Sequence, residues 1–364
     1  MTPTHAELNE LEQTANTLFV DLCTPASAAA AETDGWHPRL WAAIDQAGFT
    51  DVSVPEERGG AGGTPAEALA ILRAAGRSAA AVPLAETGLM AGQLLTAAGL
   101  DLPLGVRIVV PPAGADELVL EGDQLSGTAR GLAWGRHASW IVVLLPRDGE
   151  NLVAVLPGPA LEMTTGVSVV ADVNLAGEPR DDLTFDHVPV ARKSLAPVGT
   201  DPGALQLLGA AGRAAMMAGA LSSMADLTLR YTRQRKQFGK PVSSFQSVQQ
   251  HLVTLHQQAA LVSAAVDGML TAISNGPAPF EIAAAKLLAN QAAVAATRAA
   301  HQAHGAIGMT QEYQLHQFSR RLWSWRAEYG NDRYWSSRLG SGVASAGPDA
   351  LYPTITAGSA AMTP

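Results

Sequence analysis

The sequence predicts an α+β protein in which a helical domain, a β domain and a four-helix domain follow one another along the chain. Apolar residues recur at spacings of three and four over residues 1–102, a pattern typical of helices with one buried face. Short β-branched runs separated by turn residues occupy residues 103–198, and long apolar segments return over residues 199–346. We expect the remaining residues, 347–364, to form a loose tail.

Helices account for the whole of the predicted N-terminal domain. The stretch ELNELEQTANTLF places Leu8, Leu11 and Ala15 on one helix face. Further helices are predicted from the segments HPRLWAAIDQAGF, TPAEALAILRAAGRSA and PLAETGLMAGQLLTAAGL. Each of these segments begins near a proline, where the missing N–H group is tolerated.

The middle region predicts a small antiparallel barrel or sandwich. Its β-branched runs are separated by Asp, Gly and Pro turns and read RIVVPPAG, ELVLEGDQLSGTA, SWIVVLLP, LVAVLP and DDLTFDHVPV. Within the second run, LEGDQLSG indicates a β-hairpin with Gly122-Asp123 at its tip.

Four long helices with short connections predict an antiparallel bundle in the C-terminal region. Small residues in the first of them permit close helix packing, and Asn275-Gly276-Pro277 stops the second. The four segments cover residues 204–234, 244–273, 280–308 and 310–339.

The composition excludes several classes of function. The chain has 24 Lys and Arg against 33 Asp and Glu, a formal net charge of −9, so we expect no nucleic-acid partner. The single Cys23 excludes an intramolecular disulfide and a cysteine-built metal cluster, which fits a reducing cytosol. The N-terminus shows no basic start before an apolar stretch, and charged or amide residues break the Ala-rich runs. We therefore expect a cytoplasmic protein without a secretory signal or a membrane span.

A metal site is not expected either. His301 and His304 have the i, i+3 spacing of one helix face, and Glu312 and His316 follow in the sequence. A third histidine or a carboxylate at ligand spacing is missing from this group.

Basic residues crowd the connection between the first two C-terminal helices, RYTRQRKQFGKPVSSFQSVQQHL. They are Arg230, Arg233, Arg235, Lys236 and Lys240. A solvated loop with cations near a helix C-terminus would explain the charge alone. Phe238 and Phe245 are unfavourable in water, and Ser243-Ser244 offers N-cap hydroxyls before a run of glutamines. Together these features favour a site for a cofactor with a diphosphate and a flat ring.

Three motifs resemble those of the acyl-CoA dehydrogenase family. YTRQRKQFGKPVSSFQSVQ resembles that family's R-x-Q-F-G-x-x signature followed by F-Q-x-x-Q, and AAHQAHGAIGMTQEYQLHQFSRRL resembles its Q-x-x-G-G-x-G-F/Y-x-x-E-Y-P signature. LWAAIDQAGFTDVSVPEERGGAGG is similar to its N-terminal motif. The motifs occur in the family's order and span nearly the whole chain. The resemblance implies a flavoprotein in which FAD lies between the β domain and the C-terminal bundle and reaches a neighbouring subunit.

Six residues match positions that contact FAD in the family: Arg235, Gln237, Phe238, Gln302, Gly305 and Ala306. The resemblance implies that the first three contact the FAD of a neighbouring subunit and that the last three close over its other end. Ala306 stands where the family has a second glycine, Met309 replaces an aromatic residue, and Gln314 replaces a proline. These departures indicate a divergent branch.

The family's catalytic carboxylate is missing from both places where the resemblance would put it. In the family this group removes the α proton of an acyl-CoA while the flavin takes the β hydride. The first place, in a Y-E-G-T stretch, is held by Tyr329, and Glu328 lies one residue early, about 100° away around a helix. The second place falls near Gly209, where no carboxylate is close. The catalytic residue is therefore unknown.

The β domain also departs from the family. The T-E-P-x-x-G-S-D segment that faces the flavin has no counterpart in residues 100–135, and SGTARGLAWGRHASWIVV lacks the usual flavin-facing Thr. Trp134 could pack against the flavin, although a core position is more typical of a strand tryptophan. Core or interface positions are likewise predicted for Trp323, Trp325 and Trp335.

These losses together resemble the shortened subunit of actinobacterial heterotetrameric acyl-CoA dehydrogenases that act on steroid side chains. In such an α2β2 assembly a homologous catalytic subunit carries the base, and the shortened subunit completes its FAD site. We therefore expect a subunit that helps to oxidise an acyl-CoA to its 2,3-enoyl-CoA and passes electrons to an acceptor. Two alternatives remain open: an active homo-oligomer that uses Glu328 or Asp332 as an unusual base, and a flavin-free scaffold.

Overall fold

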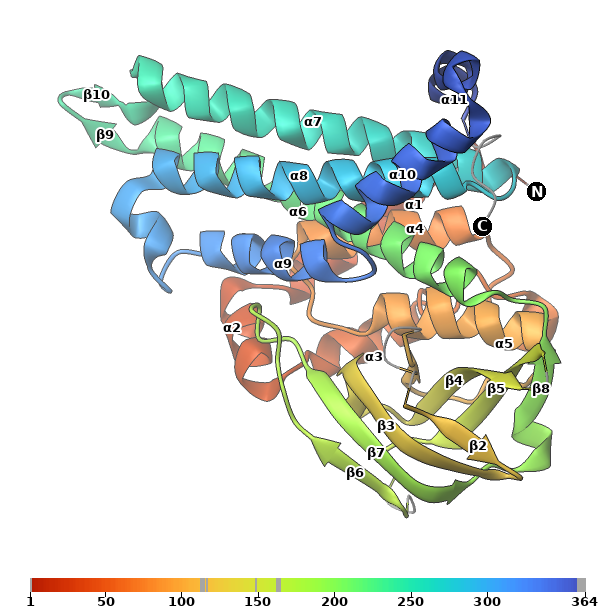
Figure 1. The fold of residues 1–364 in the computed structure, drawn as a ribbon. Helices are drawn as coiled ribbons and strands as arrows, with labels where there is room; N and C mark the ends of the chain where they lie inside the picture. Colours follow the sequence, from red (N-terminus) through yellow and green to blue (C-terminus); the bar gives the residue numbers. More distant parts are fainter. Residues whose placement is uncertain (1, 112–114, 116, 148, 162–164, 359–364) are drawn as a thin grey trace. The chain divides into compact units, whose positions relative to one another are not determined.

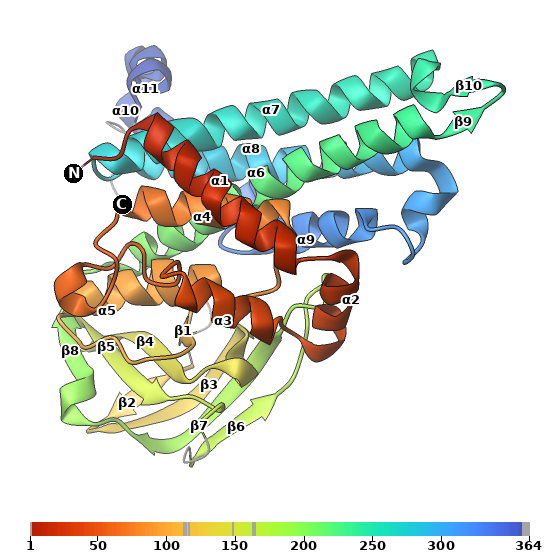
Figure 2. The same ribbon diagram turned by 180° about the vertical axis from the view of Figure 1, so that it is seen from behind.

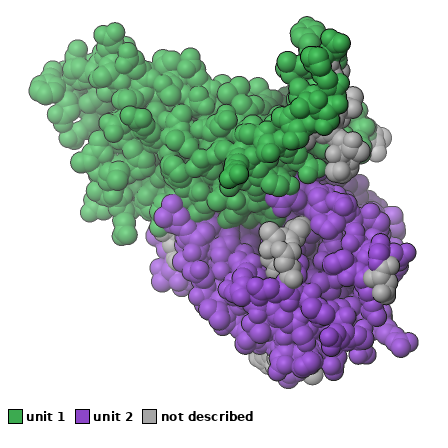
Figure 3. Space-filling model, in the orientation of Figure 1, with its two compact units in different colours: residues 1–28, 69–80, 210–364 green, residues 29–68, 81–209 purple. Residues whose placement is uncertain are grey.

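The computed structural model describes residues 2–111, 115, 117–147, 149–161 and 165–358. The chain forms two compact units that alternate along the sequence (Figure 3). The helical unit comprises residues 1–28, 69–80 and 210–364, and the sheet unit comprises residues 29–68 and 81–209. Three helices begin in one unit and end in the other: α2 (Pro25–Asp34), α4 (Pro65–Arg77) and α6 (Pro202–Gln234).

The sheet unit contains two four-stranded sheets (Figure 1). One sheet has the strand order β1-β4-β5-β8 and the other β2-β3-β7-β6. The strands are β1 (Arg107–Val109), β2 (Val119–Glu121), β3 (Gln124–Ala133), β4 (Trp140–Arg147), β5 (Glu150–Pro157), β6 (Val167–Val170), β7 (Arg180–Pro189) and β8 (Leu195–Val198). The predicted β region is confirmed, but β1 and β4 pair in parallel, which the sequence pattern did not predict.

Two local predictions in the sheet unit are also confirmed. The hairpin at LEGDQLSG forms between β2 and β3, where Glu121 pairs with Gln124 and Gly122 takes the turn with a φ of +63°. Trp134 is 0% exposed, and the guanidinium of Arg180 lies 5.2 Å from its ring centroid. Trp134 is therefore a core residue, as its strand context predicted.

The predicted N-terminal helices all form. Their prolines stand where expected, because Pro38 and Pro65 are the first residues of their helices. Part of the last predicted helix is a fully buried π-helix. The elements are α1 (His5–Leu22), α3 (Pro38–Gln46), α4, the π-helix η2 (Ala85–Gly92) and α5 (Gln93–Ala98).

Long helices dominate the helical unit (Figures 1 and 2). The chain leaves α6 through the short β9–β10 hairpin and returns along α7, and both views show this hairpin beyond the ends of the two helices. The remaining elements are β9 (Lys236–Gln237), β10 (Lys240–Pro241), α7 (Gln246–Asn275), α8 (Pro279–His304), the 3-10 turn η7 (Gly305–Met309), α9 (Leu315–Ala327), α10 (Asp332–Ala346) and α11 (Leu351–Ala357).

The prediction of one continuous fourth C-terminal helix over residues 310–339 is wrong. Its residues form α9 and α10 with a turn between them at residues 328–331. Tyr329 and Gly330 have φ values of +51° and +100°, which a right-handed helix cannot contain. The Asn331 side chain then caps the start of α10.

Two further C-terminal predictions have mixed outcomes. Part of the segment expected to be a loose tail is helical, since α11 lies within it; residues 359–364 lie outside the described residues. Trp325 and Trp335 are both 0% exposed and are core residues, whereas Trp323 is 40% exposed beneath the guanidinium of Arg326.

Helix α6 packs closely against α4 through glycines. A Cβ atom at Gly219 would come within 2.0 Å of the carbonyl oxygen of Arg73, and one at Gly76 would come equally close to that of Met216. This confirms the close packing predicted from the small residues of α6. By length and composition α6 could also cross a membrane, but 83% of its apolar stretch is buried inside the protein. Core helices of soluble proteins pass the same test, so this is weak evidence for a membrane span.

Arg73 ties three helices of the helical unit together. Its side chain is 9% exposed and donates to Glu12 on α1 at 2.7 Å and to Asp267 on α7 at 2.5 Å. Arg77, one turn further along α4, is 35% exposed and lies 3.7 Å from Asp226. Buried ion pairs are costly to break from one side, whereas exposed pairs contribute little.

We therefore expect Arg73→Met to lower the free energy of unfolding by about 2 kcal/mol, because it leaves two carboxylates without their cation. Arg77→Met, the matched control on the same helix, should change it by less than about 1 kcal/mol. Urea denaturation of both variants measures the difference. Equal losses in the two variants would contradict the role assigned to Arg73.

Candidate functional site

The β9–β10 hairpin presents the aromatic and basic residues that the sequence singled out. Phe238 stands at its tip with a φ of +51° and is 90% exposed. Its ring meets the ring of Phe245 edge-on at 6.2 Å, and the ammonium of Lys240 lies 4.5 Å from the same Phe245 ring. An exposed phenylalanine at a hairpin tip leaves apolar surface in water.

A pocket of about 620 Å³ opens beside this hairpin. Five of the six residues predicted to bind the cofactor line it, although they come from three separate elements. Arg235 immediately precedes strand β9, and Gln237 lies within it. Gln302 belongs to the end of α8, and Gly305 and Ala306 belong to η7. The sixth, Phe238 at the hairpin tip, is not among the residues that line the pocket. Their role in binding stays a prediction.

Aromatic rings that the sequence reading missed form part of the pocket and its support. His304 stacks on Tyr231 with ring centroids 4.6 Å apart, and Tyr313 approaches both rings at 5.0 and 5.5 Å. Tyr231 and His304 line the pocket. The sequence positions of both residues indicated that they could line the pocket. Tyr231 precedes Arg235 by one helical turn, and His304 adjoins Gly305.

Burial favours the neutral form of the His304 ring, and one hydrogen bond fixes its tautomer. Burial lowers the pKa of this histidine below its ordinary value, and Nδ1 donates to the carbonyl oxygen of Ala300 at 2.8 Å. Nε2 is then an acceptor, and it has no hydrogen-bond partner among the described residues. Burial also raises the pKa of Tyr313, so its hydroxyl remains protonated.

The pocket suits one nucleotide half of a dinucleotide. Arg235 supplies a permanent positive charge, which recognises phosphate through charge-assisted hydrogen bonds. Gly305, with a φ of +66°, lets the backbone approach a ligand closely, and two glutamine amides provide directional hydrogen bonds. Apolar walls and the aromatic stack suit a flat ring. The residues present therefore fit FAD.

The described residues contain no group of three or more His, Cys, Asp or Glu that could hold a metal ion. The histidines of this region are engaged locally instead. Nδ1 of His316 lies 2.9 Å from the carbonyl oxygen of Tyr313, and His304 is stacked as described above.

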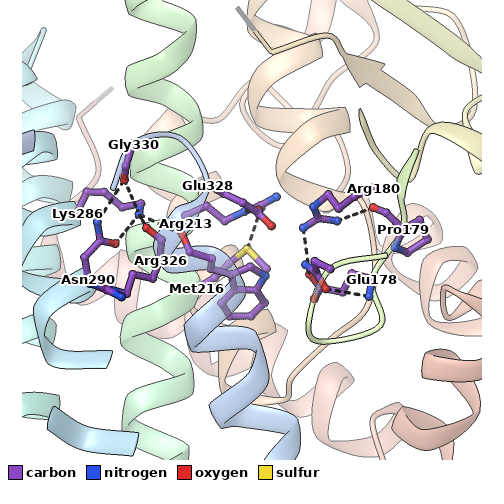
Figure 4. A network of polar contacts seen from close by, with 12 residues as sticks. Glu178, Pro179, Arg180, Arg213, Met216, Lys286, Asn290, Arg326, Glu328 and Gly330 are labelled. Carbon is purple, nitrogen blue, oxygen red and sulfur yellow. Dashed lines mark hydrogen bonds and ion pairs between the residues drawn. The ribbon is translucent and has the colours of Figure 1, made fainter. Parts of the chain in front are cut away.

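The turn at residues 328–331 contains the position at which the resemblance places the family's catalytic base. Glu328 ends α9 and accepts a hydrogen bond from Nε of Arg213 on α6 at 2.6 Å (Figure 4). The side chain of Arg213 is 1% exposed, and its guanidinium lies 5.4 Å from the ring centroid of Tyr329. The Glu328 carboxylate is therefore held against the buried guanidinium of Arg213. The second location, Gly209, lies on α6 and carries no side chain.

The turn itself is strained and tightly held. Tyr329 is not glycine, yet it adopts a φ of +51°, and its carbonyl oxygen accepts from Nε1 of Trp335 at 3.1 Å. A Cβ atom at Gly330 would lie 2.4 Å from that same Nε1, so only glycine fits. On the other side of the turn, Asp332 pairs with Arg326.

Solved structures establish the fold class. The chain is similar to a subunit of the ChsE4–ChsE5 complex from Mycobacterium tuberculosis, with a TM-score of 0.85 and 22% identity over 94% of this chain and 98% of that one. It is also similar to a chain of the Tcur3481–Tcur3483 steroid ACAD, with a TM-score of 0.78 and 24% identity over 94% and 98%. At these identities the likeness shows the fold, which is the predicted acyl-CoA dehydrogenase fold.

The family follows from the sequence matches. The acyl-CoA dehydrogenase N-terminal domain matches residues 5–101, and the acyl-CoA dehydrogenase C-terminal domain matches residues 207–334. The chain belongs to the acyl-CoA dehydrogenase family, whose members are FAD-dependent flavoproteins. A curated relative is the acyl-CoA dehydrogenase IpdE2 of Mycolicibacterium smegmatis, 29% identical over 303 residues that cover 81% of this chain and 85% of the relative. Membership of this family supports an oxidoreductase that acts on acyl-CoA.

The strain in the turn yields a direct test. Gly330→Ala should destabilise the chain by about 2–4 kcal/mol, because the new methyl group meets Trp335 and the backbone needs a positive φ. Gly340→Ala on α10 is the matched control, since a Cβ there meets nothing within 4 Å and alanine favours a helix. Thermal unfolding of both variants compares them. A Gly330→Ala variant as stable as the wild type would show that the turn is not rigid.

Proposed function

We propose that this chain is a subunit of an FAD-dependent acyl-CoA dehydrogenase that completes the FAD site of a homologous catalytic partner and does not supply the base. One observation carries the proposal. The chain keeps the pocket around Arg235, whereas the only glutamate beside the family's base position, Glu328, is paired with the buried Arg213.

The retained pocket would hold the nucleotide end of FAD. The guanidinium of Arg235 would bind phosphate, Gln237 and Gln302 would donate or accept through their amides, and the backbone at Gly305 would approach closely. Phe238 is left at the hairpin tip, 90% exposed, where it can contact a group on another chain. When bound, FAD supplies the acceptor for the hydride that leaves the β carbon of the acyl-CoA.

The spacing along α6 favours a role in trans. Arg213 and Arg235 are 22 positions apart on and just after this helix, which corresponds to about 33 Å at 1.5 Å per residue. That distance is about the diameter of a small domain. A cofactor bound at Arg235 is therefore far from the residue 328–331 turn of the same chain. This favours an active site completed between chains.

Proton removal is assigned to the partner because both carboxylates at the turn are already paired. Glu328 accepts from Arg213, and Asp332 pairs with Arg326. Tyr329, at the position of the base, is a weak proton acceptor at neutral pH because an ordinary phenol has a pKa of about 10. We therefore infer that the charged residues of the turn stabilise its structure and do not accept a substrate proton.

The relatives support a proposal for the assembly and the substrate. One similar structure is described as a steroid ACAD and another as the ChsE4–ChsE5 complex, so each comes from an assembly of two different chains. We infer an α2β2 heterotetramer that oxidises a steroid side-chain acyl-CoA to its 2,3-enoyl-CoA in the cytoplasm. An electron-transferring protein would reoxidise the flavin.

Co-expression with the homologous partner tests the proposal. The chain alone should purify with little FAD, and the complex should be yellow and active. Within the complex, Arg235→Ala should weaken FAD binding about 30-fold, because a charge-assisted contact is worth about 2 kcal/mol. Arg233→Ala is the matched control: this exposed arginine is two residues away and does not line the pocket. Full FAD loading and turnover by the chain alone would refute the role in trans.

A second variant separates the proposal from an active homo-oligomer. Glu328→Gln keeps an acceptor for Arg213, so turnover of the complex should stay within about threefold of the wild type. If Glu328 is instead the base, the same change should cost about 10²- to 10⁴-fold in kcat. Flavin content and the melting temperature serve as controls for folding. A flavin-free scaffold would show no visible flavin absorbance in any preparation.

A further inference from the structure

A second pocket lies in the helical unit, and the proposed function assigns it no role. Its volume is about 310 Å³, at the small end of the range for ligand pockets. Its lining residues belong to α1, α4, α6 and α9 or stand directly beside these helices, so we call it the α1–α9 pocket. It has no lining residue in common with the pocket beside the β9–β10 hairpin.

One face of α6 forms a wall of the α1–α9 pocket. Four residues of this helix line the pocket at positions i, i+3, i+4 and i+7, a spacing that puts their side chains on the same face. They are Ser223, Asp226, Leu227 and Arg230. The next residue, Tyr231, lines the other pocket, about 100° further round the helix. Helix α6 therefore contributes a different face to each pocket.

The charges that line the α1–α9 pocket do not balance. Of its described lining residues, Arg77 and Arg230 are cations, and Asp226 is the one anion. Arg77 lies 3.7 Å from Asp226, which is too long for a hydrogen bond. Neither arginine donates a side-chain hydrogen bond to another described residue. One positive charge is therefore left over, and the N–H groups of both guanidiniums are available to a ligand.

Half-buried hydrogen-bonding side chains complete the lining. They come from all four helices or from residues directly beside them: Asn16, Ser78, Ser223 and Gln314. None of these four side chains makes a hydrogen bond to another described residue. Groups of this kind are paired with water or with a ligand. Since hydroxyl, amide and guanidinium groups can all donate, a ligand that brings only acceptors suits them.

The most buried part of the lining carries no charge. Leu227 and Phe318 are 4% and 7% exposed. Cys23 lines the pocket as well, and burial raises the pKa of its thiol to about 12, although Arg321 opposes this shift. The thiol is therefore neutral at neutral pH and does not repel an anion. A short apolar part of a ligand can contact Leu227 and Phe318.

We propose that the α1–α9 pocket binds a small oxyanion, a carboxylate or phosphate group on a body of a few atoms. Arg77 and Arg230 donate charge-assisted hydrogen bonds to the oxyanion. The serine hydroxyls and the amides of the lining donate to its remaining lone pairs. The ligand neutralises the positive charge that the lining leaves over. This inference requires neither FAD nor a partner chain.

Isothermal titration calorimetry of the full chain in Tris chloride tests the proposal with two probes, inorganic phosphate and succinate. At least one probe is expected to bind one to one with a Kd of about 1 mM or tighter, and the tighter probe identifies the head group. Arg230→Ala should weaken this binding about tenfold, because it removes a charge-assisted contact. Arg77→Met should weaken it as well.

Two further variants locate the bound anion. Arg233→Ala is the matched control, since this exposed arginine lies three residues beyond Arg230 on α6 and lines neither pocket. Arg235→Ala removes the cation of the pocket beside the β9–β10 hairpin. Both variants should bind the probe as tightly as the wild type. Melting temperatures check the folding of every variant.

Three results would overturn the proposal. The first is no saturable binding of either probe up to about 10 mM. The second is binding that Arg230→Ala and Arg77→Met leave unchanged, which would indicate an adventitious ion only. The third is binding that is lost in Arg235→Ala alone, which would place the anion in the other pocket. Because the two pockets share no residue, failure of this proposal and failure of the proposed function are separate results.

Discussion

The ion pair between Arg213 and Glu328 constrains the rest of the helical unit. A guanidinium that is 1% exposed requires a partner, because an unpaired buried charge is costly by several kcal/mol. Glu328 provides that partner through a hydrogen bond of 2.6 Å from Nε of Arg213. The ion pair therefore links the end of α9 to α6 and stabilises the fold at the position where the family carries its base.

Helix α6 connects this ion pair along the chain to the pocket beside the β9–β10 hairpin. It begins near the position of the second possible base, passes Arg213, and delivers the chain to Arg235 at its far end. Its close packing on α4, through Gly76 and Gly219, holds the helix in place. Helix α6 therefore contributes to different places in the helical unit. Arg235, just after its end, lines that pocket, and Arg213, closer to its start, forms the ion pair with Glu328.

The sequence predicted those parts of the fold and the site that depend on local chemistry. The β2–β3 hairpin follows from its Gly122-Asp123 turn, and the predicted pocket residues lie in two short motifs that the resemblance to the acyl-CoA dehydrogenase family identified. The break after α9 has a local signal in Gly330-Asn331, of the kind that stops the second C-terminal helix at Asn275-Gly276-Pro277. Lys286, far away in the sequence, adds contacts to the end of α9 and to Gly330 that the sequence does not reveal. The stacking of Tyr231 on His304 depends on how two separate helices pack, so the sequence does not predict it.

A change of the side chain at residue 329 need not disturb the turn that carries it. The turn joins α9 to α10, caps one helix with Lys286 and starts the next with Asn331. Each of these contacts contributes to folding whether or not residue 329 is a carboxylate. Tyr329 can occupy the position because its ring packs beneath Arg213, which a shorter acidic side chain would not do. The contacts that hold the backbone of this turn therefore do not depend on an acidic side chain at residue 329.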